Sequence, residues 1–270
     1  MDMIGGDLGM IALLTLVGVL AGFIDSIAGG GGLITVPALL MVGLDPVSAL
    51  ATNKLQSTFG SFSAAYAFIR AGHIRLKTAF PMAAASLIGS VAGAASVKIL
   101  PVELLAGFLP LILVGVAIYF LLSPRMRDED AKARISPAAF IGTAAFGIGF
   151  YDGCFGPGTG SFFMIAFVTL LGFAVVKAVA YTKLLNFASN IGALAFFILA
   201  GGVNWSYGIG MGIGQFIGAR LGAGQAMRNG ARIIRPLLVV VSSAMAIRLM
   251  LDPANPLRMG LISLWNASVP

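Results

Sequence analysis

Long apolar runs, broken only by short polar or Gly/Pro stretches, make up most of the 270 residues of this chain. Because one helical crossing of a bilayer takes about 20 residues, these runs leave no room for a soluble domain. Charged residues make up only 10% of the chain, against about 25% in an ordinary soluble domain, which excludes a water-soluble enzyme of this size. The sequence predicts an all-α integral membrane protein. The runs are read at residues 8–25, 33–44, 48–70, 77–98, 103–122, 137–152, 160–172, 177–200, 205–222 and 232–251.

The placement of basic residues decides how many of these runs cross the membrane. The runs at 33–44 and 160–172 give only about 18–20 Å of helix, which is short for a hydrocarbon core of roughly 30 Å. If all ten runs cross, twelve loop Lys and Arg residues lie on one side and three on the other. If the two short runs are re-entrant, the division is nine against six. Since basic loops stay in the cytoplasm, ten crossings are favoured, with both termini outside the cytoplasm.

The two halves of the chain resemble each other. Residues Met41–Gln56 align without gaps to Leu170–Leu185, with six identities in sixteen positions. The alignment predicts an N-terminal transmembrane repeat at 1–124, a cytoplasmic connecting loop at 125–136 and a C-terminal repeat at 137–270. Because each half holds five crossings, an odd number, the second repeat must be inverted in the membrane. This plan is common in secondary transporters, whose binding sites lie near the midplane where broken helices meet.

Glycine-rich stretches interrupt both halves at corresponding positions, each just before a short run. A helix N-terminus at membrane depth offers unpaired N–H groups and the positive end of the helix dipole to an anion. The alternative, about equally favoured, is that these glycines only permit tight turns and close helix approach. The residues concerned are Gly29, Gly30, Gly31 and Gly32 in the first half, and Gly156, Gly158, Thr159 and Gly160 in the second.

Two lysines are the most informative residues. Lys54 and Lys183 lie about two turns inside hydrophobic runs, at equivalent repeat positions, with no carboxylate three or four residues away. A lysine in the membrane interior costs at least about 2.5–3.5 kcal/mol and marks a functional site by default, although snorkelling to the interface is the alternative. Polar neighbours favour the functional interpretation, and together they predict a binding site for a small oxyanion. These neighbours are Thr52, Asn53, Gln56 and Ser57 in the first copy, and Thr182, Asn186 and Asn190 in the second.

Other residues leave alternatives open. Asp25 and Asp152 begin the glycine motifs, where they can cap the next helix or pair with a lysine, which we favour, or carry a coupling proton. The Gly-x-x-x-Gly series, such as Gly214–Gly222, predicts close helix packing. Such a face could pack within one protomer or between the two protomers of a homodimer.

Composition also bears on cofactors and partners. One His, one Cys and scattered carboxylates supply no metal-ligand cluster or nucleophile–base set, so we expect no cofactor, no metal and no enzymatic activity. The net charge of +7 is typical of cytoplasmic loops in a membrane protein. The expected partners are therefore the lipid bilayer and a small anion, with no nucleic acid.

The motifs resemble those of a known family. The first half reads AGFIDSIAGGGGLITVPALL followed by ALATNKLQSTFGS, and the second reads GFYDGCFGPGTGSFFM followed by TKLLNFASNIGAL. Both stretches are similar to the TauE/SafE sulfite exporter family, and the resemblance runs from about residue 12 to residue 250. It implies a bacterial inner-membrane transporter of sulfite or organosulfonates. Composition and spacing by themselves reach only an oxyanion.

These observations lead to one main hypothesis and one alternative. The main hypothesis is a secondary transporter, an exporter, that moves a small sulfur oxyanion by alternating access at a cationic midplane site. The alternative is an anion channel that uses the same site as a filter.

Overall fold

The computed structural model describes residues 8–97 and 129–251, with a few isolated positions between and beyond these stretches. The predicted run at 103–122, most of the connecting loop before residue 129, and both ends of the chain lie outside the described residues. The part that the structure describes is helical throughout and contains no strand.

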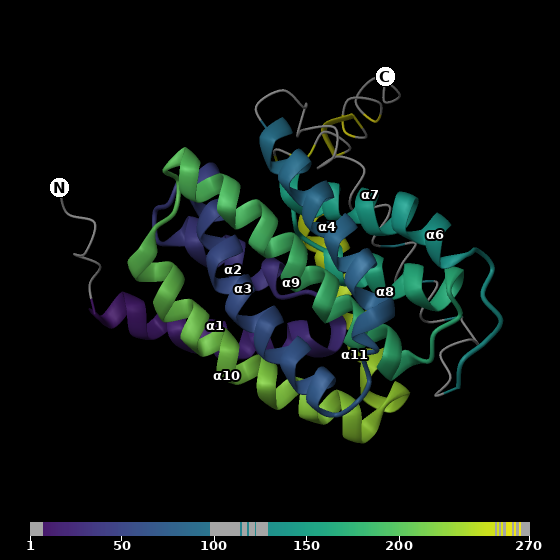
Figure 1. Cartoon of the computed structure of the whole chain (residues 1–270). Coiled ribbons are helices and arrows are strands. Elements are labelled where there is room, and N and C mark those ends of the chain that lie inside the picture. Colours follow the sequence, from purple (N-terminus) through teal and green to yellow (C-terminus); the bar gives the residue numbers. More distant parts are fainter. Residues whose placement is uncertain are drawn as a thin grey trace.

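Helices follow the predicted apolar runs closely (Figure 1). Each described helix falls on one predicted run, and the run at 137–152 forms α6, a π-helical turn and α7 in succession. The first half contains α1 (Leu8–Ala28), α2 (Gly32–Met41), α3 (Pro46–Arg70) and α4 (Leu76–Ser96). The second half contains α6 (Pro137–Phe140), the π turn (Ile141–Ala145), α7 (Phe146–Cys154), α8 (Thr159–Leu170), α9 (Val175–Ala200), α10 (Trp205–Asn229) and α11 (Ala231–Leu251).

Three of the described helices, α1, α4 and α9, are long and apolar enough to cross a membrane. The helices α2 and α8 are apolar but have only 10 and 12 residues, as the short runs predicted. A multi-pass membrane protein follows from these lengths, whereas the number of crossings and the inverted relation of the halves stay predictions.

Helix starts have local causes. Asp45 caps α3, its carboxylate accepting hydrogen bonds from the N–H groups of Val47 and Ser48. Ser136 caps α6 in the same way by accepting from the N–H of Ala139. The break between α7 and α8 depends on Gly156 and Gly158, whose positive φ values of 93° and 86° suit glycine alone among common residues.

Helices from one half pack mainly against helices from the other half: α1 lies along α10, α4 along α7, and α3 beside α9. Figure 1 shows the purple α1 and the light-green α10 running side by side. The helix formed by each half's first apolar run therefore rests on the helix formed by the other half's fourth run.

Glycines make two of these contacts very close. A Cβ atom added to Gly218 on α10 would lie 1.9 Å from the carbonyl oxygen of Val19 on α1. The matching interface is equally tight, since a Cβ on Gly93 of α4 would lie 2.0 Å from the carbonyl oxygen of Phe150 on α7. The packing role predicted for the Gly-x-x-x-Gly series is confirmed, and for Gly214–Gly222 the contact is made within one protomer.

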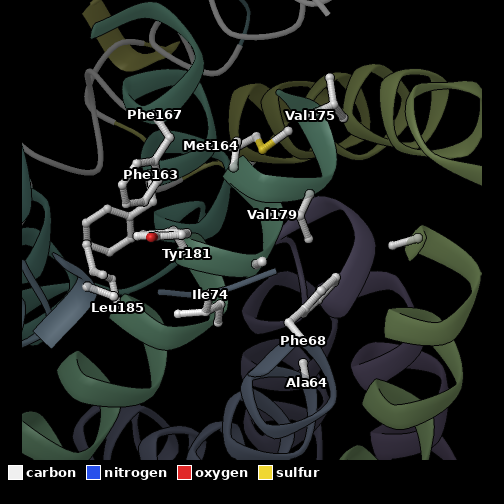
Figure 2. Packing of buried hydrophobic residues seen from close by; sticks show 14 of the residues in the cluster. Ala64, Phe68, Ile74, Phe163, Met164, Phe167, Val175, Val179, Tyr181 and Leu185 are labelled. Atoms are coloured by element: carbon white, nitrogen blue, oxygen red, sulfur yellow. The ribbon is translucent and has the colours of Figure 1, made fainter. Parts of the chain in front are cut away.

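A large apolar core joins α8 and α9 to α3 and the turn after it. Figure 2 shows Tyr181 of α9 between the aromatic rings of α8 and Leu185, with Ile74 between this group and Phe68 of α3. The hydroxyl group of Tyr181 lies 3.1 Å from that of Thr78 at the start of α4. The buried ring thus keeps a polar partner and fixes α9, which carries one of the two lysines.

Candidate functional site

The turns of the two glycine motifs touch each other. A Cβ added to Gly160 would lie 2.4 Å from the Cα of Gly29, so the end of α1 and the start of α8 are in backbone contact. The hydroxyl group of Ser161 donates to the carbonyl oxygen of Ala28 at 3.1 Å and closes the contact. Glycine is therefore required at this point for close approach, the packing role that sequence alone left open.

A small polar cavity, which we call the tip cavity, lies where these turns meet. Its volume is about 30 Å³, room for about one or two water molecules. The first residues of α2 and α8 both line it, so two helix N-termini converge on one space, as the sequence predicted. Every lining residue was a candidate site residue: Asp25, Gly29, Gly32, Asn53, Ser57, Asp152, Gly156, Gly158, Thr159, Gly160, Asn186 and Asn190.

Lys54 on α3 pairs with Asp152 at the end of α7. Its Nζ lies 2.8 Å from Asp152 Oδ1, and the exposed fractions of the two side chains are 1% and 5%. The same ammonium group also donates to the main-chain carbonyl of Asp152. Asp152 Oδ1 accepts a further hydrogen bond from the hydroxyl group of Thr159 at 2.9 Å. This buried ion pair holds α3, α7 and α8 together.

Lys183 on α9 makes the corresponding pair with Asp25 of α1. Lys183 Nζ lies 2.9 Å from Asp25 Oδ2, and the exposed fractions are 1% and 19%. The other carboxylate oxygen accepts the N–H of Gly31 at 3.0 Å. Asp25 therefore both pairs with a lysine and satisfies an N–H group at the start of α2, the two roles that the sequence analysis favoured.

The electrostatic expectation needs correction. The sequence predicted a cationic site, because no carboxylate lies nearby along either helix, although it also favoured capping or pairing with a lysine for Asp25 and Asp152. The structure pairs each lysine with the aspartate of the other half, so the four formal charges sum to zero. Neither lysine lines the tip cavity, and neither reaches out by snorkelling. The aspartates line the cavity in their place.

A hydrogen-bonded network supports the first-half side of the tip cavity. Asn53 Oδ1 accepts from the hydroxyl group of Thr35 and from the amide group of Gln56, each at 2.6 Å. Gln56 also donates to Ser57 Oγ at 3.0 Å. The network ties α2 to α3. Thr35 was missed by sequence reasoning, although a single hydroxyl residue near the start of the apolar run at 33–44 was a signal.

On the second-half side of the tip cavity, some polar side-chain atoms lack a hydrogen-bond partner. The amide group of Asn190 donates to the carbonyl oxygen of Asn186 at 2.7 Å. Asn186 Oδ1 and Asp152 Oδ2 are buried without a hydrogen-bond partner among the described residues, and both residues line the tip cavity. Two unpaired acceptors beside this cavity suit water or a donor group from a ligand.

Some candidate residues lie away from the tip cavity. Thr52 accepts the N–H of Asn204 at 3.0 Å and so holds the turn before α10. A Cβ on Gly30 would lie 2.2 Å from Val241 of α11, which makes Gly30 a packing residue. Gln56, Gly31 and Thr182 do not line the tip cavity either.

A second hollow, the α2 hollow, adjoins the tip cavity through Gly32, which lines both. Its volume is about 400 Å³. Arg248 of α11 is its charged residue and donates from Nη1 to the carbonyl oxygen of Leu33 at 2.8 Å. Sequence analysis did not single out Arg248, Phe155 or Pro157. The lining residues are Gly32, Leu33, Val36, Pro37, Leu40, Phe155, Pro157, Arg248, Leu251 and Pro253.

Metal binding finds no support in this part of the chain. Across residues 8–97 and 129–251, no three His, Cys, Asp or Glu side chains gather in a group that could hold a metal ion.

Comparison with known proteins gives consistent results. A family model described as "Sulfite exporter TauE/SafE" matches residues 14–249. A probable membrane transporter protein, ORF9, of Sinorhizobium sp is 53% identical over 252 residues, covering 93% of this chain and 97% of that protein. The probable membrane transporter protein YfcA of Escherichia coli strain K12 is 46% identical over 243 residues, 90% of each chain. A probable membrane transporter protein of Haemophilus influenzae is 43% identical over 249 residues, 92% of this chain and 97% of that protein. No solved structure matches the chain.

Proposed function

Because this chain belongs to the TauE/SafE sulfite exporter family, whose matched relatives are named membrane transporters rather than enzymes, we propose a specific transport activity for it. The protein is a secondary transporter that exports a small sulfur oxyanion, sulfite or an organosulfonate, through the tip cavity. The observation that carries this proposal is the meeting of two helix N-termini and two Lys–Asp pairs at one polar cavity.

Chemistry at the tip cavity suits an oxyanion that replaces a carboxylate. Helix N-termini stabilise negative charge through free N–H groups and the helix dipole. In this structure the two aspartates are the ion-pair partners of the ammonium groups of Lys54 and Lys183. An entering oxyanion exchanges with a carboxylate as the partner of a lysine, and the displaced aspartate takes up a proton from water. Neither the buried lysine nor the displaced aspartate is then left with an uncompensated charge. Such a site binds an anion without the cost of an isolated buried ammonium group.

The size of the tip cavity implies motion during transport. A volume of about 30 Å³ holds about one or two waters, which is too little for sulfite with its four heavy atoms. Separation of the two glycine turns, which are in backbone contact, would enlarge it. Rocking of one repeat against the other, the usual movement of inverted-repeat transporters, separates them, and the adjoining α2 hollow provides a route to one side.

Membrane orientation fits export. We place the protein in the bacterial inner membrane with both termini in the periplasm, on the basis of its basic loops. An inside-negative potential then favours the exit of an anion by about 2.3 kcal/mol per charge per 100 mV. Reporter fusions at the C-terminus test this orientation, and a cytoplasmic C-terminus contradicts it.

Flux measurements in proteoliposomes test the transport activity. Efflux of sulfite, sulfate, sulfoacetate and taurine is compared for the wild type, the Lys54→Ala/Lys183→Ala variant and a control variant, Lys77→Ala, whose lysine is exposed at the start of α4. We expect saturable sulfite or sulfonate efflux that is lost in the double variant and retained in Lys77→Ala. Unimpaired flux in the double variant removes the lysines from the mechanism, and single-channel conductance favours the channel alternative.

A further inference from the structure

A second polar hollow, the basic pocket, lies apart from the tip cavity. Its volume is about 530 Å³, and it is enclosed by the turn after α3, the start of α9 and the junction of α10 with α11. By the charge distribution, all of these segments lie on the predicted cytoplasmic side. The lining residues are His73, Ala174, Val176, Lys177, Met227, Arg228, Asn229, Gly230 and Arg232.

Positive charge dominates this pocket. Lys177, Arg228 and Arg232 line it, and no carboxylate does. Within the part of the chain that the structure describes, neither arginine takes part in an ion pair. His73, the remaining titratable group, is half-buried against the ring of Phe68. Two guanidinium groups and one ammonium group thus face a single hollow with one local counter-ion at its edge.

That counter-ion is Asp130, and its contacts show which kind of ligand group the edge of the basic pocket accepts. Asp130, from the connecting loop, accepts the N–H of Ala174 through Oδ1 at 2.8 Å and pairs with Lys177 through Oδ2 at 2.5 Å. A carboxylate of the chain is therefore already bound at the N-terminus of α9, where the helix dipole favours an anion. Arg228 and Arg232 line the same pocket, are exposed, and have no such partner among the described residues.

The bias of basic residues toward the cytoplasm does not explain this arrangement. That bias requires basic residues in cytoplasmic loops but not their gathering around one hollow from three separate segments. Arginine is also the residue best suited to the planar, bidentate binding of oxyanion groups, and basic pockets between cytoplasmic helix ends bind lipid phosphates.

We propose that the basic pocket is a second anion site, which binds a phosphate-like oxyanion group between Arg228, Arg232 and Lys177. The group comes from one of two sources with the same chemistry: the headgroup of an anionic lipid, or a free inorganic oxyanion from the cytoplasm. This site is independent of the proposed transport function, because its occupancy can be measured without any flux.

Chemical protection of individual arginines tests the site. The full-length protein in phosphatidylcholine nanodiscs is treated with phenylglyoxal, and peptide mass spectrometry measures the modification rate of each arginine. One arm adds inorganic phosphate, and the other replaces part of the phosphatidylcholine with cardiolipin. Arg134, which is exposed in the connecting loop of the same molecule, is the internal control.

Protection of Arg228 and Arg232 by about threefold or more, the effect of a ligand at about twice its dissociation constant, with Arg134 unchanged, supports the site. Protection by phosphate identifies a free oxyanion, and protection by cardiolipin identifies a lipid. The variant Lys177→Gln should reduce this protection, and Lys132→Gln, which removes an exposed charge from the connecting loop, should not. If Arg228 and Arg232 are protected no more than Arg134 in both arms, the proposal is wrong.

Discussion

The two Lys–Asp pairs come from equivalent sequence motifs but differ in their surroundings. Asp152 is 5% exposed, and Lys54 binds both its carboxylate and its main-chain carbonyl. Asp25 is 19% exposed, and Lys183 binds only its carboxylate. Both aspartates line the tip cavity, but the Lys54–Asp152 pair, which we call the sealed pair, is the more deeply buried of the two.

This difference indicates how a repeated motif can serve a transporter. If the repeats are inverted copies, each conformation that opens to one side must place the two copies in different environments. The sealed pair then belongs to the closed side and the more exposed pair to the side that opens more easily. The predictions below test this asymmetry, from the largest expected effect to the smallest.

Removing the lysine of the sealed pair should have the largest effect. Lys54→Met leaves the Asp152 carboxylate buried without a counter-ion, which costs about 3–5 kcal/mol of folding stability, and transport should be lost. Denaturant unfolding in detergent measures the loss, with Lys77→Met as the control. A loss of stability no larger than that of the control shows that Asp152 finds another partner or becomes neutral by taking up a proton.

Removing the other lysine should cost less. Lys183→Met leaves Asp25 with the N–H of Gly31 and with access to water, so we expect a loss of about 1.5–3 kcal/mol. Transport should be lost as in the first variant. The same unfolding measurement applies, and equal stability losses in the two lysine variants rule out the asymmetry.

The contact between the two glycine turns lines the same cavity as both aspartates, so loosening it should affect both pairs. Gly160→Ala places a Cβ 2.4 Å from the Cα of Gly29, so overpacking should cost about 1–3 kcal/mol and separate the turns. Gly147→Ala on α7 is the control, because nothing lies within 4 Å of its added Cβ. Thermal unfolding compares the two, and similar midpoints show that the turns are not in tight contact.

Breaking the exposed ion pair between Asp130 and Lys177 should have the smallest effect on stability. Partial burial opposes the charged form of Asp130, but hydrogen bonds from the Ala174 N–H and from Lys177 outweigh it and lower the pKa of Asp130 below its ordinary 3.8. This contribution is therefore present above pH 3.8 and is lost as the pH falls below that value through the lowered pKa.

Because the side chain of Asp130 is 52% exposed, solvent screening keeps the contribution below about 1 kcal/mol. Hydrogen exchange of residues 129–135 in wild type and Asp130→Asn, corrected for the intrinsic rate, should differ at neutral pH and converge below the lowered pKa. If the exchange rates of the two proteins still differ at low pH, contacts other than the Asp130 ion pair hold this loop in place.

Local features allowed most helix bounds to be predicted. The apolar runs gave α3, α9 and α11 to within two residues at each end, because hydropathy and caps act over a few neighbouring residues. The prediction was least accurate for α10, which continues to Asn229, seven residues beyond the predicted end at 222. The basic and polar residues there mark where the helix leaves an apolar environment, not where its hydrogen bonds end.

The sequence by itself determined an all-helical membrane protein, the family, and a set of glycine and polar residues that includes every residue lining the tip cavity. It could not supply the partners of those residues. Lys54 and Asp152 are 98 positions apart, and Lys183 and Asp25 are 158 apart, whereas periodicity reports only neighbours within a turn or two. Only the tertiary structure decided that each lysine is neutralised by the other half, because a buried ammonium group must find its counter-ion wherever packing places one.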